Sequence, residues 1–443
     1  MSETQEKVIA AKKASLILSN TSRAVKDKAL NEIASSLWRE SNSVIKAASK
    51  DVTLAKIEVE EGRLPKPVLD RLKVDESKLR NIVEMVKSVS NLDDPVNKTL
   101  NCTELDQEFE LYKVTCPIGV VGVVFESRPD VLPQISSLCL KSGNAVILKG
   151  GHEASNVNRE LFKIVNEASI SSGIPEGWIQ ILEERKDILD LLKLDKSVDL
   201  IIPRGSNDFV KFVQDNTRIP VLGHSAGVCN LYVDQKANLN KAINIAFDAK
   251  VQYPSVCNSL DCLLVHRDIA RTFLPKIMEK FEKAGVVVRG CENTKKILDH
   301  FQVLAATNED WGKEYLDLII AIKVVNNGEE AIEYINVYGS GHTDSIITED
   351  KQMAKQFLNS VDSSTVILNA STRFSDGYRY GLGAEVGIST SKIHARGPVG
   401  LEGLITYKYI LLGDGNTVSE YVGPNAKNFR HKDLNKKLPF NNQ

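Results

Sequence analysis

The sequence lacks any apolar run of about 18 residues, the length that a membrane-spanning helix needs. Its N-terminal segment also contains no apolar stretch long enough for a signal peptide. Neither membrane insertion nor export is therefore expected. The sequence predicts a soluble protein that stays in the cytoplasm.

An excess of charge of one sign is missing as well. Lysine and arginine total 56 residues and aspartate and glutamate total 58, which leaves a net charge of -2 among 443 residues. The two signs are interleaved, so no basic stripe is present to neutralise nucleic-acid phosphates. We expect a small-molecule substrate, and neither a nucleic acid nor a membrane as partner.

Cysteines are few and are not paired in spacing. Their number, seven, is odd, which excludes the disulfide framework of a small secreted domain and predicts reduced thiols. Cys257, Cys262 and His266 do not predict a zinc site. Cys262 and His266 are four residues apart on a predicted strand, which separates them by about 13 Å. We expect no metal.

The dinucleotide fingerprint G-x-G-x-x-G is absent after the first apolar strand, where Glu126 and Ser127 stand instead. Two other features suit a nucleotide: Lys149-Gly150 at the end of the second strand, and Gly205-Ser206 at the start of a helix. A lysine near the ribose attracts a 2′-phosphate, which favours NADP. A solvated turn and a helix N-cap account for the same residues equally well.

Apolar periodicity predicts an α/β protein. Residues 1 to about 95 have the three-and-four spacing of helices, and 109–114 alternate as an exposed strand does. From residue 117, apolar strands alternate with amphipathic helices, and a second block of this kind begins near residue 230. The pattern predicts a doubly wound, Rossmann-like parallel sheet with helices on both faces, followed by a second α/β domain.

Cys257 lies in a predicted loop between an amphipathic helix and an apolar strand, where a side chain can face a cleft. A nucleophile suits that place if neighbouring donors or cations favour the thiolate. A small buried hydrophobic residue is the other interpretation. Local sequence leaves both open.

Four arginines lie in or beside loops that contain proline or glycine, where a guanidinium group can grip a carboxylate or a phosphate. They are Arg128, Arg204, Arg379 and Arg396. Surface salt bridges are the alternative for each of them.

Several motifs occur in order from about residue 117 to 410: FESRPDV, LKGG, IIPRGS, LGHSAGVCNLYVD, PSVCNSLD, VYGSGHTDSI, GLGAEVGIST and HARGPVGLEGL. Together they resemble the gamma-glutamyl phosphate reductases, a branch of the aldehyde dehydrogenase superfamily. The resemblance implies three parts of the chain. Residues 1–228 would form N-terminal helices and an NADP-binding domain with an arm strand near 105–116, 229–400 a catalytic domain, and 401–443 a C-terminal oligomerisation strand and tail.

The resemblance also implies an activity, which is NADPH-dependent reduction of L-glutamyl 5-phosphate to L-glutamate 5-semialdehyde and phosphate in proline biosynthesis. Cys257 would be the nucleophile and form a thioester, with backbone N–H groups near it, Asn258 and the Ser127 region assisting. Glu314 would hold the nicotinamide ribose, and His224 would lie near the substrate. A homo-oligomer and a glutamate 5-kinase partner are further implications.

One departure from the aldehyde-oxidising relatives is informative. Where they carry a water-activating glutamate, this chain has Val221, which fits an enzyme that must protect a thioester from water. Asn230 stands where many members carry histidine. An aldehyde dehydrogenase that oxidises a small aldehyde is the alternative function, and a non-enzymatic descendant is a rival from another class.

Overall fold

The structure is a computed structural model, and it describes residues 2–66, 68–223 and 226–440. The chain forms two compact units. Unit 1 comprises Met1–Leu222, Leu382–Gly387 and Val399–Gln443, and unit 2 comprises Gly223–Gly381 and Ile388–Pro398. Residues 401–443, expected as a separate C-terminal segment, are part of unit 1.

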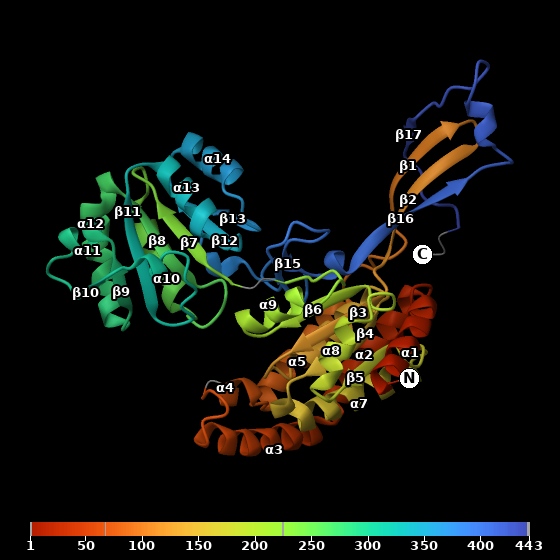
Figure 1. Cartoon of the computed structure of the whole chain (residues 1–443), viewed down its shortest axis with the longest axis horizontal. Coiled ribbons are helices and arrows are strands. Elements are labelled where there is room, and N and C mark those ends of the chain that lie inside the picture. The colour runs from red at the N-terminus through yellow and green to blue at the C-terminus, as the bar shows by residue number, and fades with distance from the viewer. Residues whose placement is uncertain (1, 67, 224–225, 441–443) are drawn as a thin grey trace. The chain divides into compact units, whose positions relative to one another are not determined.

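Unit 1 begins with helices and continues with alternating strands and helices (Figure 1). The N-terminal helices are α1 (Glu3–Leu18), α2 (Arg23–Arg39), α3 (Ser41–Glu60), α4 (Val68–Leu72) and α5 (Glu76–Ser90). The strands of its parallel sheet are β3 (Val120–Phe125), β4 (Ala145–Gly150), β5 (Ile179–Leu182) and β6 (Leu200–Arg204). The helices between and after them are α6 (Val131–Lys141), α7 (Ser155–Ser171), α8 (Lys186–Leu192) and α9 (Asn207–Asp215).

The parallel sheet of unit 1 has the strand order β5-β4-β3-β6. All six residues of β3 are buried, as expected for a strand that is covered on both faces. Val120 and Val124 pack with Val8 of α1, Leu191 of α8 and Val213 of α9. The strand order reverses between β3 and β6, and open α/β sheets bind ligands beyond the carboxyl ends of the strands at such a point. The predicted doubly wound sheet is confirmed.

Gly143 ends α6 as the sequence predicts. Its φ of 75° lies in the left-handed region, which glycine adopts without the steric penalty of a side chain. A methyl group there would also lie 2.9 Å from Pro117 Cγ. The turn therefore requires glycine, and it delivers the chain directly into β4.

An antiparallel sheet in unit 1 joins distant parts of the sequence (Figure 1). Its strands are β1 (Thr99–Asp106), β2 (Phe109–Pro117), β16 (Ile405–Leu412) and β17 (Lys432–Leu434), in the order β16-β2-β1-β17. The predicted strand at 109–114 is confirmed, and it pairs with β16 of the same chain. We call this sheet the arm; its small core contains Cys102, Tyr112, Val114 and Leu438.

Unit 2 contains a seven-stranded parallel sheet in the order β10-β9-β11-β8-β7-β12-β13. The strands are β7 (Cys229–Val233), β8 (Leu260–His266), β9 (Val287–Gly290), β10 (Val303–Ala305), β11 (Ile319–Val325), β12 (Thr343–Ile347) and β13 (Thr365–Leu368). Its helices are α10 (Leu239–Val251), α11 (Arg267–Lys283), α12 (Glu292–Ile297), α13 (Gly328–Tyr338) and α14 (Lys351–Ser360). Two short strands, β14 (Gly387–Ser389) and β15 (Gly397–Val399), pair where the chain passes between the units.

Helices cover both faces of the unit 2 sheet. Leu231 and Val233 of β7 pack in one apolar cluster with α10 and α11, whereas Tyr232 packs in another with α13 and α14. This division follows from the strand geometry, because successive side chains point to opposite faces. Unit 2 is thus a second α/β layer structure, as predicted.

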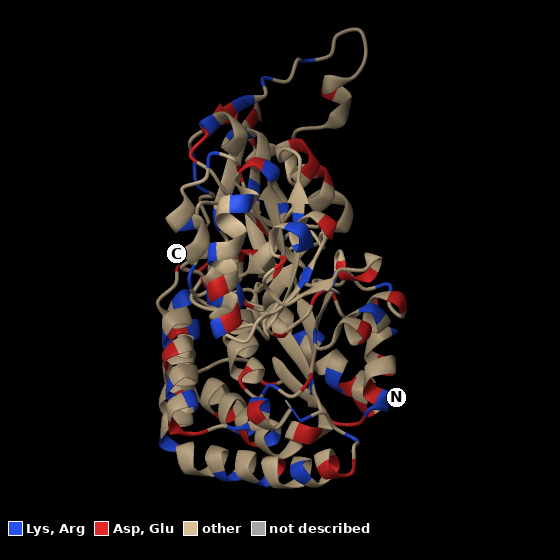
Figure 2. Cartoon of the chain, turned by 90° about the vertical axis from the view of Figure 1, so that its left-hand side faces the viewer, with Lys and Arg blue, Asp and Glu red and all other residues tan. Residues whose placement is uncertain are grey.

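No helix in the described residues is long and apolar enough to cross a membrane. Basic and acidic residues are interleaved along the elements that Figure 2 colours by charge, as the sequence indicated.

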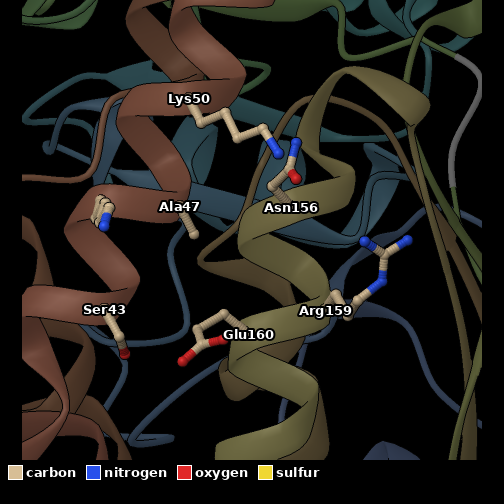
Figure 3. A pocket seen from close by; sticks show the side chains of 7 residues that line it. Ser43, Ala47, Lys50, Asn156, Arg159 and Glu160 are labelled. Carbon is tan, nitrogen blue, oxygen red and sulfur yellow. The ribbon is translucent and has the colours of Figure 1, made fainter.

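A surface hollow of about 570 Å³ lies between α3 and α7 of unit 1. Figure 3 shows Lys50 of α3 and Asn156 of α7 pointing toward one another across it. Asn156 also donates its side-chain amide to Asp51 Oδ1 at 2.6 Å. None of the candidate catalytic or binding residues lines this hollow.

Buried ion pairs hold the N-terminal helices. Lys26 of α2 pairs with Asp94, and the two side chains are 1% and 3% exposed. Lys141 of α6 pairs with Asp27 and donates to Ser90 O at 2.8 Å. Burial lowers the pKa of Lys26, and Asp94 opposes that change. The carboxylate of Asp94 therefore depends on Lys26 for compensation of its charge.

The variant Lys26→Met should lower the free energy of unfolding by about 3–5 kcal/mol, because it leaves a buried carboxylate without its partner. Urea unfolding of the full chain measures the effect. Lys28→Met is the matched control, since Lys28 lies on the same helix but is exposed, and it should change stability by less than about 0.5 kcal/mol. Equal losses in the two variants would contradict the assigned role of the pair.

Candidate active site

Three segments of unit 2 meet at the amino ends of neighbouring strands. Gly227 precedes β7, the Cys257 loop joins α10 to β8, and Glu314 precedes β11. The sheet places β11, β8 and β7 side by side and parallel, so their amino ends share one edge. The residues that lead into these strands are brought together for that reason.

The backbone of Gly227 lies between Cys257 and Glu314. A methyl group on Gly227 would lie 2.5 Å from Cys257 Cβ, 2.7 Å from Cys257 O and 2.9 Å from Glu314 Oε1. These distances are shorter than any ordinary contact of a Cβ atom. Only glycine allows the three segments to approach this closely, and the approach places the thiol and the carboxylate around one short piece of backbone.

The Cys257 loop is anchored by hydrogen bonds at the cysteine and at the residue that follows it. Cys229 Sγ donates to Cys257 O at 3.2 Å. Asn258 Nδ2 donates to Ser375 O at 2.8 Å, and Thr372 Oγ1 donates to Asn258 O at 2.8 Å. Cys257 is half-buried, whereas Cys229 is fully buried, and burial raises the pKa of Cys229 well above its usual value. Of the two thiols, Cys257 is the accessible one.

Asn258 adjoins the candidate nucleophile, as the sequence places it. Its side-chain oxygen is buried and accepts no hydrogen bond from the described residues, while its Nδ2 is engaged by Ser375. Its role as a catalytic donor stays a prediction.

Asp261 connects all three segments of the site. It accepts hydrogen bonds from Cys229 N at 3.5 Å and from Tyr315 N at 3.1 Å, and it lies 3.8 Å from Lys250 Nζ. Burial raises the pKa of Asp261 to about 7, which Lys250 opposes, and burial lowers the pKa of Lys250. The carboxyl group thereby fixes the Glu314 segment relative to the strand that follows Cys257.

In unit 1, the residues predicted to bind a cofactor lie at the carboxyl ends of two strands. Lys149 and Gly150 are the last residues of β4, and Gly205 and Ser206 follow β6. Ser206 N donates to Glu126 Oε2 at 2.9 Å, and Ser206 Oγ accepts from Phe209 N at 3.4 Å as the N-cap of α9. A methyl group on Gly205 would lie 2.5 Å from Glu126 Oε2. The free N–H group predicted to face a phosphate is thus occupied by a carboxylate in this structure.

Lys149 is almost fully buried, and its Nζ donates to Gly150 O at 2.6 Å. Burial lowers the pKa of Lys149, and four carboxylates raise it, in the order Asp187, Glu153, Glu184 and Glu183. The ammonium group therefore lies in a negative environment at the end of β4.

Ser127 has an unusual backbone for a non-glycine residue, with a φ of 47°. Both its N–H and its hydroxyl donate to Glu153 Oε1, at 2.7 Å and 2.6 Å. Its predicted catalytic part stays a prediction. Sequence reasoning missed Glu153, although it lies only four residues after Lys149.

The end of β4 has features that fit a bound dinucleotide. Asn158 is 2% exposed, and neither its Nδ2 nor its Oδ1 has a hydrogen-bond partner among the described residues. A methyl group on Gly150 would lie 2.3 Å from Asn158 Nδ2, so glycine keeps the backbone close to this amide. Unused polar atoms beside Gly150, at the carboxyl end of β4, are compatible with a polar ligand there.

The predicted arginines have different surroundings. Arg128 is half-buried ahead of α6, and Arg204 Nη1 lies 2.5 Å from where a methyl group on Gly387 would stand. Arg379 is exposed and donates to Arg373 O at 2.8 Å. Arg396 pairs with Asp362 at 3.0 Å.

The roles of these four arginines stay predictions. His224 lies outside the described residues. Cys262 and His266 both lie on β8, as predicted.

The comparisons with known proteins agree with one another. Residues 2–295 match the aldehyde dehydrogenase family. The chain is 54% identical to a gamma-glutamyl phosphate reductase of Natronomonas pharaonis, covering 98% of this chain and 99% of that one. The crystal structure of a gamma-glutamyl phosphate reductase of Thermotoga maritima superposes with a TM-score of 0.89 at 40% identity, covering 94% and 100%.

A more distant structure shares the fold. It is a glyceraldehyde-3-phosphate dehydrogenase of Methanocaldococcus jannaschii in complex with NADP, with a TM-score of 0.66 at 18% identity, covering 93% of this chain and 94% of that one.

The variant Gly227→Ala should displace the Cys257 loop, because the added methyl group has no room beside Cys257. We expect a stability loss of about 1–3 kcal/mol, typical of overpacking, together with slower alkylation of Cys257 by iodoacetamide. Thermal unfolding and mass spectrometry of the Cys257 peptide measure the two effects.

Gly285→Ala is the control, since a methyl group there meets nothing although its φ of 73° is strained for alanine. It should cost about 1 kcal/mol and leave the alkylation rate unchanged. Unaltered alkylation in Gly227→Ala would show that the close approach of Gly227 does not govern the thiol.

Proposed function

We propose that Cys257 is the nucleophile of this chain, which belongs to the gamma-glutamyl phosphate reductases of the aldehyde dehydrogenase family. Such an enzyme reduces L-glutamyl 5-phosphate to L-glutamate 5-semialdehyde and phosphate in proline biosynthesis. The observation that carries the assignment of Cys257 is its position next to Gly227 and Glu314, where three strands begin.

The reaction begins with attack of the Cys257 thiolate on the acyl carbon of the substrate. A C–S bond forms, and the bond from that carbon to the phosphate oxygen breaks, so phosphate leaves with the electron pair. NADPH, when bound, supplies the hydride that reduces the thioester. The electron pair of the C–S bond then returns to Cys257 as the aldehyde is released.

Water must be kept from hydrolysing the thioester. Val221 stands where the aldehyde-oxidising relatives carry a water-activating glutamate, and it pairs with Ile201 as a short extension of the unit 1 sheet. It also packs against the apolar cluster of that sheet. An apolar residue there supplies no general base, which supports reduction over hydrolysis.

We assign the cofactor to the carboxyl ends of β3, β4 and β6. Members of the aldehyde dehydrogenase family use a nicotinamide dinucleotide. Lys149, Gly150, Gly205 and Ser206 would hold its phosphates and ribose. Glu314 is the residue that we propose for the nicotinamide ribose. The ammonium group of Lys149 is the one we select for the 2′-phosphate of NADPH.

The four arginines and His224 are the candidates for binding the substrate carboxylate and the leaving phosphate. Ser127 and Asn258 would lie near the reacting oxygen.

We further propose a cytoplasmic homo-oligomer. The edge strand β16 of the arm exposes Tyr407, Tyr409 and Leu411 by 47%, 61% and 50%. Such an exposed apolar edge is normally covered. We also propose that a glutamate 5-kinase transfers the acyl phosphate directly.

The variant Cys257→Ser should abolish phosphate-dependent oxidation of glutamate 5-semialdehyde, which is the reverse reaction and avoids the unstable acyl phosphate. NADPH formation is followed by absorbance. Cys116→Ser is the control, because Cys116 is another half-buried thiol but lies on β2 in unit 1. Activity that needs no phosphate would indicate an ordinary aldehyde dehydrogenase, and full activity of Cys257→Ser would exclude the thioester.

The variant Lys149→Met should raise the KM for NADPH more than the KM for NADH, because it removes the cation assigned to the 2′-phosphate. One lost charge-assisted contact corresponds to about a 10-fold fall in the ratio of kcat/KM for NADPH to kcat/KM for NADH. Lys163→Met, an exposed lysine of α7, should leave the ratio unchanged. An unchanged ratio in Lys149→Met would mean that another residue selects the cofactor.

A further inference from the structure

A short turn after β13 packs against the Cys257 loop on both sides of the cysteine. This turn, η3 (Thr372–Phe374), follows Ser371 and precedes Ser375. Thr372 and Ser375 hold Asn258, which follows Cys257. Arg373 Nε donates to Gln252 Oε1 at 3.0 Å, on the other side of the loop. The turn therefore grips the nucleophile loop at two points.

Arg373 is the charged residue of this turn, and it is only 8% exposed. Its Cζ lies 6.0 Å from the centre of the Tyr253 ring, which also belongs to the Cys257 loop. Among the described residues, no carboxylate forms an ion pair with its guanidinium group. A buried guanidinium group without a carboxylate is costly unless another anion compensates it.

The groups around the loop are mostly acidic, and a thiolate among them needs a cation. Glu314 flanks Gly227 together with Cys257, and Asp261 and Asp344 are buried near Cys229. The remaining polar and charged neighbours are Asp248 and Lys250 on α10, Cys229 on β7, His342 before β12, and Asp376 and Arg379 after η3. Lys250 lies beside Asp261, and Arg379 beside Asp376, so each of these cations already has a carboxylate nearby.

Arg373 and Cys257 are electrostatically coupled. Burial is the largest influence and lowers the pKa of Arg373, and Arg379 lowers it further; Asp376, the Cys257 thiolate and Asp248 raise it. The coupling is reciprocal, since a thiolate that favours the charged arginine is itself favoured by that charge.

We propose that Arg373 is a positioning residue that holds Cys257 as a thiolate and fixes its loop through Gln252. The nucleophile would then be charged before the acyl phosphate arrives. This inference rests on the proposed role of Cys257 as the nucleophile. Arg373 was not among the arginines selected from the sequence.

The test is the pH dependence of Cys257 alkylation by iodoacetamide in the full-length protein without substrate or cofactor, followed by mass spectrometry of the Cys257 peptide. Arg373→Gln should move the midpoint of the profile upward by about 1 pH unit, as expected when an opposite charge near a thiolate is lost. Below both midpoints, alkylation should be about 10-fold slower. Arg373→Lys should restore most of the rate, because it keeps the charge.

Arg271→Gln is the matched control, since Arg271 is exposed on α11 of the same unit. If Arg373→Gln does not fold, Gln252→Leu gives a second measurement. Gln252 is exposed, so its replacement removes the Arg373 contact without opening the core, and the midpoint should move upward by a smaller amount.

An unchanged midpoint in folded Arg373→Gln would overturn the inference. If that variant does not fold, an unchanged midpoint in Gln252→Leu would overturn it instead. A raised KM without a shift in alkylation would also overturn it and would assign Arg373 to substrate binding. The measurement is independent of turnover. Full activity of Cys257→Ser would defeat the proposed function, whereas the alkylation profile decides the influence of Arg373 on the thiol.

Discussion

The direction of the parallel strands determines which loops of this protein meet. In unit 1 the strand order reverses between β3 and β6, so the segments that leave these strands converge at their carboxyl ends. In unit 2 the segments that enter β7, β8 and β11 converge at the amino ends. Cys257, which is 30 residues from Gly227 in the sequence, thereby comes to lie directly beside it. The site is a consequence of sheet topology, to which each loop adds one or two side chains.

Much of this arrangement follows from local sequence. The apolar strands, the helix that Gly143 ends and the loop that contains Cys257 are set by periodicity and by turn residues, which act over a few positions. The resemblance to a family then related these segments to a known fold. Glu314 was assigned through that resemblance, and the structure places it beside Cys257.

The contacts that local sequence could not reveal are those between distant segments. Arg373 is separated from Gln252 by 121 residues, and nothing near either residue signals their contact. Glu126 accepts a hydrogen bond from Ser206 N because β3 and β6 are neighbours and end at the same level. Apolar periodicity alone does not specify which strands are neighbours. The arginines chosen for their loops illustrate the converse. A guanidinium group in a glycine-rich segment is as readily used for internal pairing, as Arg396 is by Asp362.

The arm sheet has a consequence for the order in which the chain folds. Strands β3 to β6 are complete once about half of the chain has been synthesised, but β2 lacks its neighbour β16 until residues 405–412 appear. Unit 2 is inserted between these partners, so the ribosome releases a whole second unit before the first can close its last sheet. Until then β2 presents an unpaired edge to the solvent, and an unpaired edge promotes aggregation of the nascent chain. In the finished protein this edge of β2 is covered by β16.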